Sequence, residues 1–206
     1  MVEPYDEQQF ADSAWSFLRS NTTSTVQFGE HTCDVSYIIS YQGKLVIPAM
    51  VAMLQPCDKI MFVPEYLNDC MEINITLNQF SEDGSGGELA DRWRIYHGEP
   101  PDVQWALVDI DAARFHEKFI DGEGLCRENT LADSEHELCK ELNAKFTDDV
   151  RTICLEETSV EVTNPVVVGV DSLGIDVRAP FGIVRIPTNE SFTSADEVIA
   201  IFRDAK

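Results

Sequence analysis

The chain has 206 residues, of which 44% are hydrophobic and 25% are charged, a composition typical of a globular protein that can bury a sizeable core. Its 37 Asp and Glu residues outnumber its 15 Lys and Arg residues, so the formal net charge is -22 at pH 7. A field of this sign repels phosphate backbones and anionic lipid surfaces, so neither nucleic acid nor a membrane is an expected partner.

The expected location of the chain follows from its apolar and cysteine content. No stretch reaches the roughly 20 consecutive apolar residues that a membrane-spanning helix needs, and the N-terminal MVEPYDEQQF is acidic where a signal peptide is basic. Six cysteines are spread along the chain without a Cys-x-x-Cys pair, which favours reduced thiols over a disulfide framework. We therefore expect a cytoplasmic protein.

The first elements in chain order are one helix and a series of strands. Apolar residues at helical spacing predict an amphipathic helix over residues 6–19. Between residues 22 and 79 the pattern becomes strand-like, in the runs HTCDVSYIISY, KLVIPAMVAML, DKIMFVP and MEINITLNQ. Such a turn-punctuated series of strands predicts a β-barrel or a β-sandwich.

The middle of the chain is less regular. The polar, glycine-containing residues 81–91 are predicted to form an exposed loop, because they contain no Lys and no strand-to-helix context that would mark a phosphate-binding loop. Residues 92–98 and 103–111 are predicted as strands separated by a Pro-Pro break, and residues 112–119 as helical. We place a domain boundary near residue 130. It separates a β-rich N-terminal domain, residues 1–130, from a C-terminal domain, residues 131–206.

The C-terminal domain centres on residues 165–187, PVVVGVDSLGIDVRAPFGIVRIP, where two tight turns join three short strands of period two. An amphipathic helix precedes this meander, with apolar residues at Leu138, Leu142, Phe146, Val150 and Ile153, and another follows it from residue 195. Capping boxes are expected at Ser134 with Glu137 and at Ser194 with Glu197. The predicted order is αβββα, and the predicted fold class is α+β.

Three segments of the chain carry residues at spacings that resemble the sequence motifs of a known protein family. The hairpin carries glycines, acids and an arginine at Gly169, Asp171, Gly174, Asp176 and Arg178. The upstream segment ARFHEKFIDGEGLCREN contains Gly122 and Gly124. Together with the helix segment ELNAKFTDDV, these features resemble the split-barrel haem-utilisation proteins of HugZ type, which are relatives of pyridoxamine 5'-phosphate oxidase. The resemblance covers about residues 30–205 and is strongest toward the C-terminus.

The resemblance implies an N-terminal FMN-binding-type split β-barrel, a small C-terminal αβββα domain, and a homodimer whose ligand clefts lie between subunits. It also implies haem or FMN as the cofactor. In the helix, Asn143 and Asp148 match the family pattern, whereas Glu141 and Phe146 stand where the family has histidines. No Lys or Arg lies between Lys59 and Arg92, a region that supplies phosphate-binding groups in flavin-binding relatives.

The remaining basic groups near the predicted barrel rim are the candidate cofactor-binding residues: Arg92, Arg94, His97, Arg114 and His116. Residues two apart on a strand share a face, so Arg92 and Arg94 are expected to present their guanidinium groups to propionates or a phosphate. A histidine, His97 or His116, would then approach the iron. The alternative is that these arginines pair with the many carboxylates of the chain.

Two functions of different classes remain open. In one, the barrel binds haem or a flavin in the dimer cleft and takes part in oxidative tetrapyrrole chemistry, which the cofactor supplies. In the other, the chain is a non-catalytic member of the same superfamily that acts as a protein- or small-molecule-binding module. No Ser-His-Asp or nucleophile-elbow pattern favours covalent hydrolysis.

Overall fold

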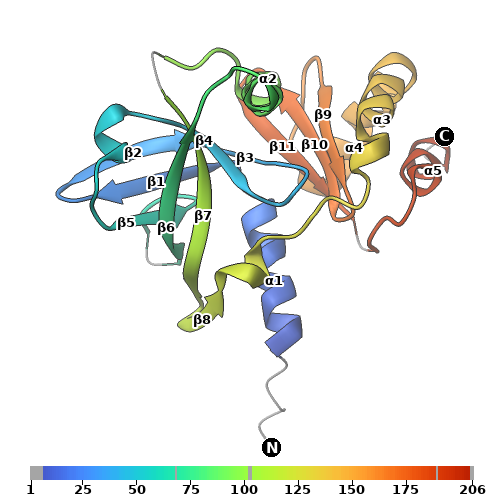
Figure 1. The fold of residues 1–206 in the computed structure, drawn as a ribbon. Coiled ribbons are helices and arrows are strands. Elements are labelled where there is room, and N and C mark those ends of the chain that lie inside the picture. The colour runs from blue at the N-terminus through green and yellow to red at the C-terminus, as the bar shows by residue number, and fades with distance from the viewer. Residues whose placement is uncertain (1–6, 68, 102–103, 189, 205–206) are drawn as a thin grey trace, which may run out of the picture. The chain divides into compact units, whose positions relative to one another are not determined.

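A computed structural model describes residues 7–67, 69–101, 104–188 and 190–204. The chain divides into two compact units, residues 1–128 and 129–206, and each unit is built on its own sheet (Figure 1). Among the described residues, no helix has the length and apolar character needed to cross a membrane.

The N-terminal unit is organised around one antiparallel sheet that curls into a half-barrel (Figure 1). Its strands are β1 (Thr23–Phe28), β2 (His31–Ser36), β3 (Ile38–Ile39), β4 (Leu45–Ala49), β5 (Lys59–Val63), β6 (Met71–Phe80), β7 (Gln104–Phe115) and β8 (Lys118–Asp121). The strand order is β2-β1-β5-β6-β7-β4-β3, and β8 pairs with β7. Short connections join β1 to β2, β3 to β4 and β7 to β8, which favours their antiparallel pairing, whereas β6 and β7 pair across the longer segment that contains residues 85–97.

Alternation of apolar residues explains why these segments are strands. In β6, Met71, Ile73 and Ile75 are buried while the residues between them are more exposed, so one face of the strand enters the core. The four strand-like runs between residues 31 and 79 contribute β2 to β6. β1 was not among the predicted runs, because four of the six residues of its sequence, TSTVQF, are polar and its only apolar residues are Val26 and Phe28.

Helices of the N-terminal unit are α1 (Glu7–Arg19), the short 3₁₀ helices η1 (Val51–Leu54) and η2 (Gly122–Leu125), and α2 (Ser85–His97). The predicted N-terminal helix is thus present, and it buries Ala14, Trp15 and Leu18. Its last turn is tied to the sheet because the Tyr37 hydroxyl donates to the Leu18 carbonyl at 2.7 Å.

Two predictions for the middle of the chain are wrong. Residues 85–97, predicted as part of a loop and then a strand, form α2, because Ala90, Trp93 and Tyr96 recur at helical spacing and are buried together. Gly98, at φ 83°, ends this helix. Residues 112–119, predicted as helical, instead complete β7, pass through a turn at His116 and Glu117, and enter β8.

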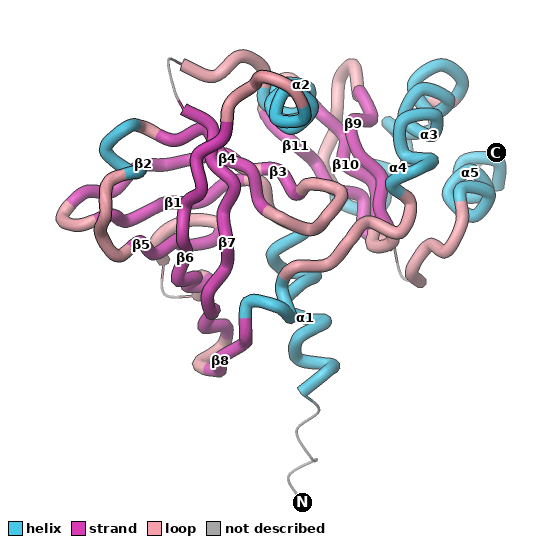
Figure 2. The backbone as a smooth tube through the Cα atoms, viewed as in Figure 1, coloured by secondary structure: helices cyan, strands magenta, loops and turns pink. Residues whose placement is uncertain are grey.

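The described residues of the C-terminal unit form an antiparallel meander and three helices, and Figure 2 shows these helices beside the strands. The strands are β9 (Val166–Asp171), β10 (Gly174–Ala179) and β11 (Gly182–Pro187), in the order β11-β10-β9, and the helices are α3 (Ala132–Lys145), α4 (Thr147–Thr158) and α5 (Ala195–Asp204). α3 packs on β9 and α4 packs on β11. The core between them contains Leu142, Val150, Val177, Val198 and Phe202.

The helix predicted before the meander is two helices that meet at Phe146, which has φ -127°. At this junction the Thr147 hydroxyl donates to the Asn143 carbonyl at 2.9 Å. The Asn143 side chain bonds both the amide and the carbonyl of Val167 at 2.8 Å, which connects the end of α3 to β9. Phe146 still packs on the core, which explains the uninterrupted apolar spacing.

The predicted capping boxes also differ from the observed helix ends. α3 begins before Ser134, whose hydroxyl donates to the Leu131 carbonyl at 3.2 Å from within the first turn. At α5, Glu197 does reach back, but it accepts from the amide of Thr193 at 2.7 Å and from the hydroxyl of Thr193 at 2.8 Å.

Candidate functional site

Helix α2 changes the relation between two of the predicted ligand-binding residues. Residues two apart in a helix point about 200° apart around its axis, so Arg92 and Arg94 do not share a face as they would on a strand. The Arg92 guanidinium lies over the ring of Tyr41, 4.5 Å from its centroid, and 5.5 Å from that of Tyr96. The two arginines therefore cannot form the predicted pair of parallel anion-binding groups.

Arg94 is surrounded by carboxylates. Its guanidinium donates to both oxygens of Glu82 at 2.9 Å, to Asp91 at 3.1 Å and to Glu99 at 3.1 Å. It also lies 5.4 Å from the ring centroid of Trp105. The positive charge of Arg94 is thus neutralised within the chain, as the alternative interpretation of these arginines expects.

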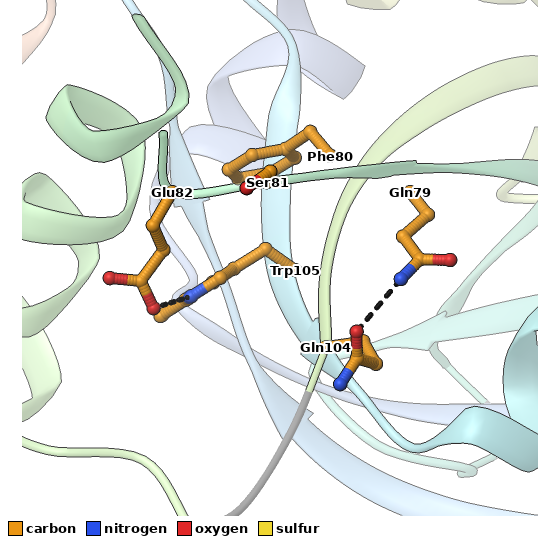
Figure 3. A pocket seen from close by; sticks show the side chains of 6 residues that line it. All are labelled: Gln79, Phe80, Ser81, Glu82, Gln104 and Trp105. Carbon is orange, nitrogen blue, oxygen red and sulfur yellow. Dashed lines mark hydrogen bonds between the residues drawn. The ribbon is translucent and has the colours of Figure 1, made fainter. Parts of the chain in front are cut away.

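Glu82 and Trp105 border a cavity with a volume of about 650 Å³, lined by Gln79, Phe80, Ser81, Glu82, Gln104 and Trp105 (Figure 3). The Trp105 indole donates to Glu82 at 2.6 Å, and this bond, followed by those from Arg94, holds the pKa of the Glu82 carboxyl below its usual range. Gln79 donates to Gln104 at 2.8 Å across the strands (Figure 3). The polar groups of this cavity mainly bond one another.

His97 is also engaged internally. Its Nε2 lies 3.1 Å from the carbonyl oxygen of Tyr37, which can only accept, so Nε2 carries the proton. The ring lies 4.8 Å from that of Trp93, centroid to centroid. His97 thus connects the C-terminal end of α2 to Tyr37, which lies between β2 and β3.

Arg114 and His116 lie near the other end of β7. Arg114 is opposite Glu72 of β6, and Arg114 Nε donates to a Glu72 carboxylate oxygen at 3.2 Å. His116 and Glu117 follow at φ 45° and 63°, which forms the tight turn into β8. Histidine is one of the non-glycine residues that tolerate this left-handed conformation best.

This end of the sheet holds a cavity of about 370 Å³, lined by Asp69, Cys70, Glu72, Arg114, His116 and Glu117. Sequence reasoning selected Arg114 and His116 but missed Cys70. Cys70 directly precedes β6, and the pairing of β6 with β7, two strands far apart in sequence, brings it to this cavity. We refer to this space as the His116 cavity.

The five predicted residues therefore form two groups. Arg94 contacts Trp105 near the start of β7, whereas Arg114 lies nine residues further on, about 30 Å along a strand of roughly 3.3 Å per residue. One small ligand cannot contact both groups. Among the described residues, no cluster of three or more His, Cys, Asp or Glu side chains is arranged to hold a metal ion.

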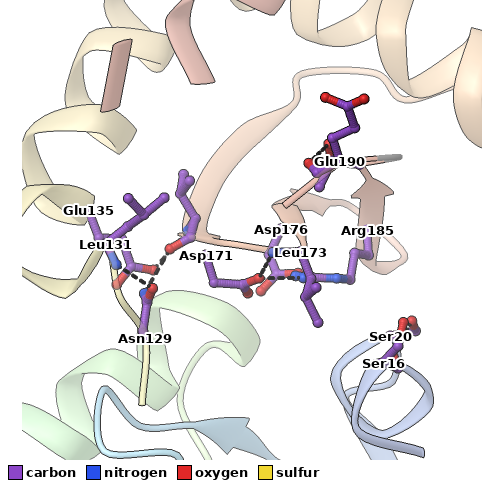
Figure 4. A network of polar contacts seen from close by, with 12 residues as sticks. Ser16, Ser20, Asn129, Leu131, Glu135, Asp171, Leu173, Asp176, Arg185 and Glu190 are labelled. Carbon is purple, nitrogen blue, oxygen red and sulfur yellow. Dashed lines mark hydrogen bonds and ion pairs between the residues drawn. The ribbon is translucent and has the colours of Figure 1, made fainter. Parts of the chain in front are cut away.

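The acid and glycine pattern of the C-terminal hairpin has a structural explanation (Figure 4). Arg185 of β11 donates to Asp176 at 2.8 Å and to Asp171 at 2.7 Å, and all three side chains are at least nine-tenths buried. Asp171 also accepts from the amide of Leu173 at 2.7 Å, which shapes the turn. Arg185 was not predicted from the sequence. It lies directly opposite Asp176 in the register of β10 and β11, so the pairing of these two strands would have indicated an ion pair.

A second buried acid supports the same sheet from α3. Glu135, only 1% exposed, accepts from the amide of Val170 at 2.8 Å, and Asn129 donates to the carbonyl of Val170 at 2.9 Å (Figure 4). These bonds satisfy the outer edge of β9. We therefore assign the polar groups of this unit to folding.

Comparisons with known proteins address the fold. No protein-family model matches the sequence, and no curated protein matches it. A crystal structure of a protein of unknown function from Agrobacterium tumefaciens str. C58 matches with a TM-score of 0.71 at 11% identity, over 100% of this chain and 98% of that chain. The chain has a split-barrel fold. The predicted α+β split barrel is thereby confirmed.

Two further solved structures show weaker similarity to this split-barrel chain. One is a heme binding protein from Mycobacterium smegmatis, with a TM-score of 0.43 at 15% identity, over 100% of this chain and 97% of that chain. The other is ChuZ from Campylobacter jejuni, with a TM-score of 0.47 at 9% identity, over 61% of this chain and 65% of that chain.

Proposed function

We propose that this split-barrel protein binds haem at the His116 cavity. The observation that carries the proposal is that one cavity brings together His116, Cys70 and Arg114. Imidazole and thiolate are both side chains that hold haem iron, and a guanidinium pairs with propionate carboxylates. The volume of about 370 Å³ lies within the range of small-molecule sites. Bound haem would supply redox chemistry at its iron.

The cavity suits haem better than a flavin mononucleotide. A flavin phosphate carries two negative charges and needs cationic or backbone donors, and Arg114 is the one Lys or Arg among the residues that line the cavity. Three carboxylates, Asp69, Glu72 and Glu117, line the same space. The iron of haem is a positive centre that can lie near these carboxylates, while its propionates would depend on Arg114.

Arg114 can still contact a ligand while it is paired with Glu72. Its side chain is 45% exposed, and a guanidinium has five N–H donors, of which one carboxylate uses only part. Glu72 nevertheless competes with a propionate for the same group. In the proposed site Arg114 orients the ligand, and His116 is the residue assigned to the iron.

The test is a titration of the purified chain with haemin, followed by the Soret absorbance. We expect stoichiometric binding by the unchanged chain, and loss or a shift of the Soret band in His116→Asn. Asparagine is the appropriate replacement because it also tolerates the positive φ at this turn. His136→Asn, which alters an exposed histidine on α3, is the matched control and should bind normally.

The electrostatic part of the proposal is tested in the same titration. Glu72→Gln removes a competing charge close to Arg114, worth about 1 kcal/mol in a water-like dielectric, so haemin should bind about five times more tightly. No Soret shift in the unchanged chain, or identical spectra for His116→Asn, would exclude this site. The protein- or small-molecule-binding module would then be the better hypothesis.

We also propose that the chain forms a homodimer, as the family resemblance implies. The N-terminal unit has several exposed large apolar side chains, at Met50, Val51, Tyr66, Leu67 and Phe119. Apolar and aromatic residues of this kind are typical of the central part of subunit interfaces. Sedimentation equilibrium should give twice the mass of the chain, and a monomer at micromolar concentration would contradict the proposal.

A further inference from the structure

An apolar groove lies between helix α1 and strand β8 of the N-terminal unit, and η2 contacts both of these elements. Its volume is about 370 Å³. The apolar part of the lining consists of Phe10 and Ala11 of α1 and of Phe119 and Ile120 of β8. None of these four side chains lines the His116 cavity. We refer to this space as the Phe119 groove.

Phe119 is the exposed aromatic residue of this groove. It is 77% exposed, whereas the next residue, Ile120, is 8% exposed and belongs to the core. On the α1 side, the ring of Phe10 lies 6.0 Å from the ring of the buried Phe115, centroid to centroid, so packing holds this side of the groove in place. An aromatic ring that is exposed beside a preformed apolar wall is typical of residues that contribute most to the binding of a macromolecular partner.

The sides of the groove carry negative charge. Glu7 and Asp121 line it and are exposed, and none of the described residues that line it is a Lys or an Arg. Asp121 Oδ1 accepts from the amide of Glu123 at 3.1 Å, which fixes this carboxylate at the start of η2. The ammonium group of Lys118 lies 5.0 Å from the centroid of the Phe10 ring, so this aromatic wall already accommodates a cation. The groove therefore matches a partner that combines apolar and cationic groups.

We propose that the Phe119 groove binds a protein segment in which an apolar anchor side chain is flanked by Lys or Arg. The anchor packs between Phe119 and Phe10, and the cationic groups approach Glu7 and Asp121. The net charge of the chain, -22, attracts such a segment over a longer range. A second copy of the chain would instead bring the same two acids against the groove, and an anionic membrane is repelled by the whole field. Docking at this groove requires no haem.

The test uses the full chain without haem and a fluorescently labelled peptide of about 15 Leu and Lys residues, spaced as an amphipathic helix. Fluorescence anisotropy at about 0.15 M salt measures the affinity. The unchanged chain should bind the peptide saturably, and Phe119→Ser should weaken binding about tenfold or more, because it removes the aromatic anchor. Asp121→Asn, which retains a side chain that can cap η2, should weaken binding about twofold to fivefold and tests the acidic side independently.

Phe181→Ser is the matched control. Phe181 is 65% exposed in the turn between β10 and β11 of the C-terminal unit, so the same substitution there should leave the affinity for the peptide unchanged. A peptide of Leu and Glu with the same spacing should not bind. Failure of the Leu and Lys peptide to bind would overturn the inference. Equal affinities of the unchanged chain and Phe119→Ser would also overturn it, because they would indicate attraction by net charge alone.

Sedimentation equilibrium of Phe119→Ser distinguishes a partner segment from a second copy. We expect the variant to have the same oligomeric state as the unchanged chain. A dimer that dissociates in Phe119→Ser but not in Phe181→Ser would assign the groove to a second copy of the chain and would contradict the proposed partner.

Discussion

Replacement of Arg185 by alanine is expected to lower the free energy of unfolding of the C-terminal unit by about 3–5 kcal/mol, because it removes the cation that two buried carboxylates share. Asp171 and Asp176 have side chains 9% and 1% exposed, and both lie within 2.8 Å of the guanidinium. Water cannot replace the lost bonds at so little exposure. In the variant the two carboxylates are still removed from water, but the ion pairs with Arg185 that offset this desolvation are lost.

The measurement is urea denaturation combined with hydrogen exchange at the amides of β9 to β11, which reports on this unit separately. Arg151→Ala is the matched control, because Arg151 pairs with Asp148 at 2.8 Å on the surface and should contribute less than about 1 kcal/mol. Arg185→Lys should restore only part of the lost free energy of unfolding, because a single ammonium group cannot reproduce the planar guanidinium that donates to both carboxylates. A loss below 1 kcal/mol in Arg185→Ala would show that the network is not a major source of stability.

The regular parts of the fold could be predicted because local pattern and final environment agree. β6 alternates buried Met71, Ile73 and Ile75 with outward-facing residues, and the meander is marked by short turns. Helix α2 could not be predicted in this way. It begins with Ser85, Gly86 and Gly87, which disfavour a helix, and tertiary contacts compensate. The Trp93 indole, for example, donates to the Ser36 carbonyl at 3.1 Å.

The incorrect prediction of a strand in place of helix α2 also limited how much of the candidate site could be predicted. A strand over residues 92–98 would place Arg92 and Arg94 on one face, whereas the helix turns them apart. His116 was selected for its chemistry alone. Cys70, which lines the same cavity, was not predicted, because β6 and β7 are far apart in sequence and pair only in the folded chain.

Gly122→Ala is expected to destabilise the N-terminal unit by at least about 3 kcal/mol, more than a typical overpacking substitution. A Cβ atom built on Gly122 would lie 1.8 Å from the carbonyl oxygen of Ile110. Ile110 is within β7, where it pairs with Ile75 of β6, so its carbonyl cannot move without disturbing the centre of the sheet. Relief of the clash requires backbone displacement in either η2 or β7.

Gly124, the second glycine of the same segment, is the matched control. A Cβ there would meet the side-chain Cγ2 of Ile120 at 3.3 Å, and a small side-chain adjustment can relieve that contact. Gly124→Ala should therefore change the free energy of unfolding by less than about 1 kcal/mol, partly offset by the lower entropy of the unfolded chain. Urea denaturation of the two variants measures the difference. Equal losses of free energy of unfolding in the two variants would show that the close approach of Gly122 to β7 is not important for stability. The expected difference would explain why Gly122 is required in this segment and Gly124 is replaceable.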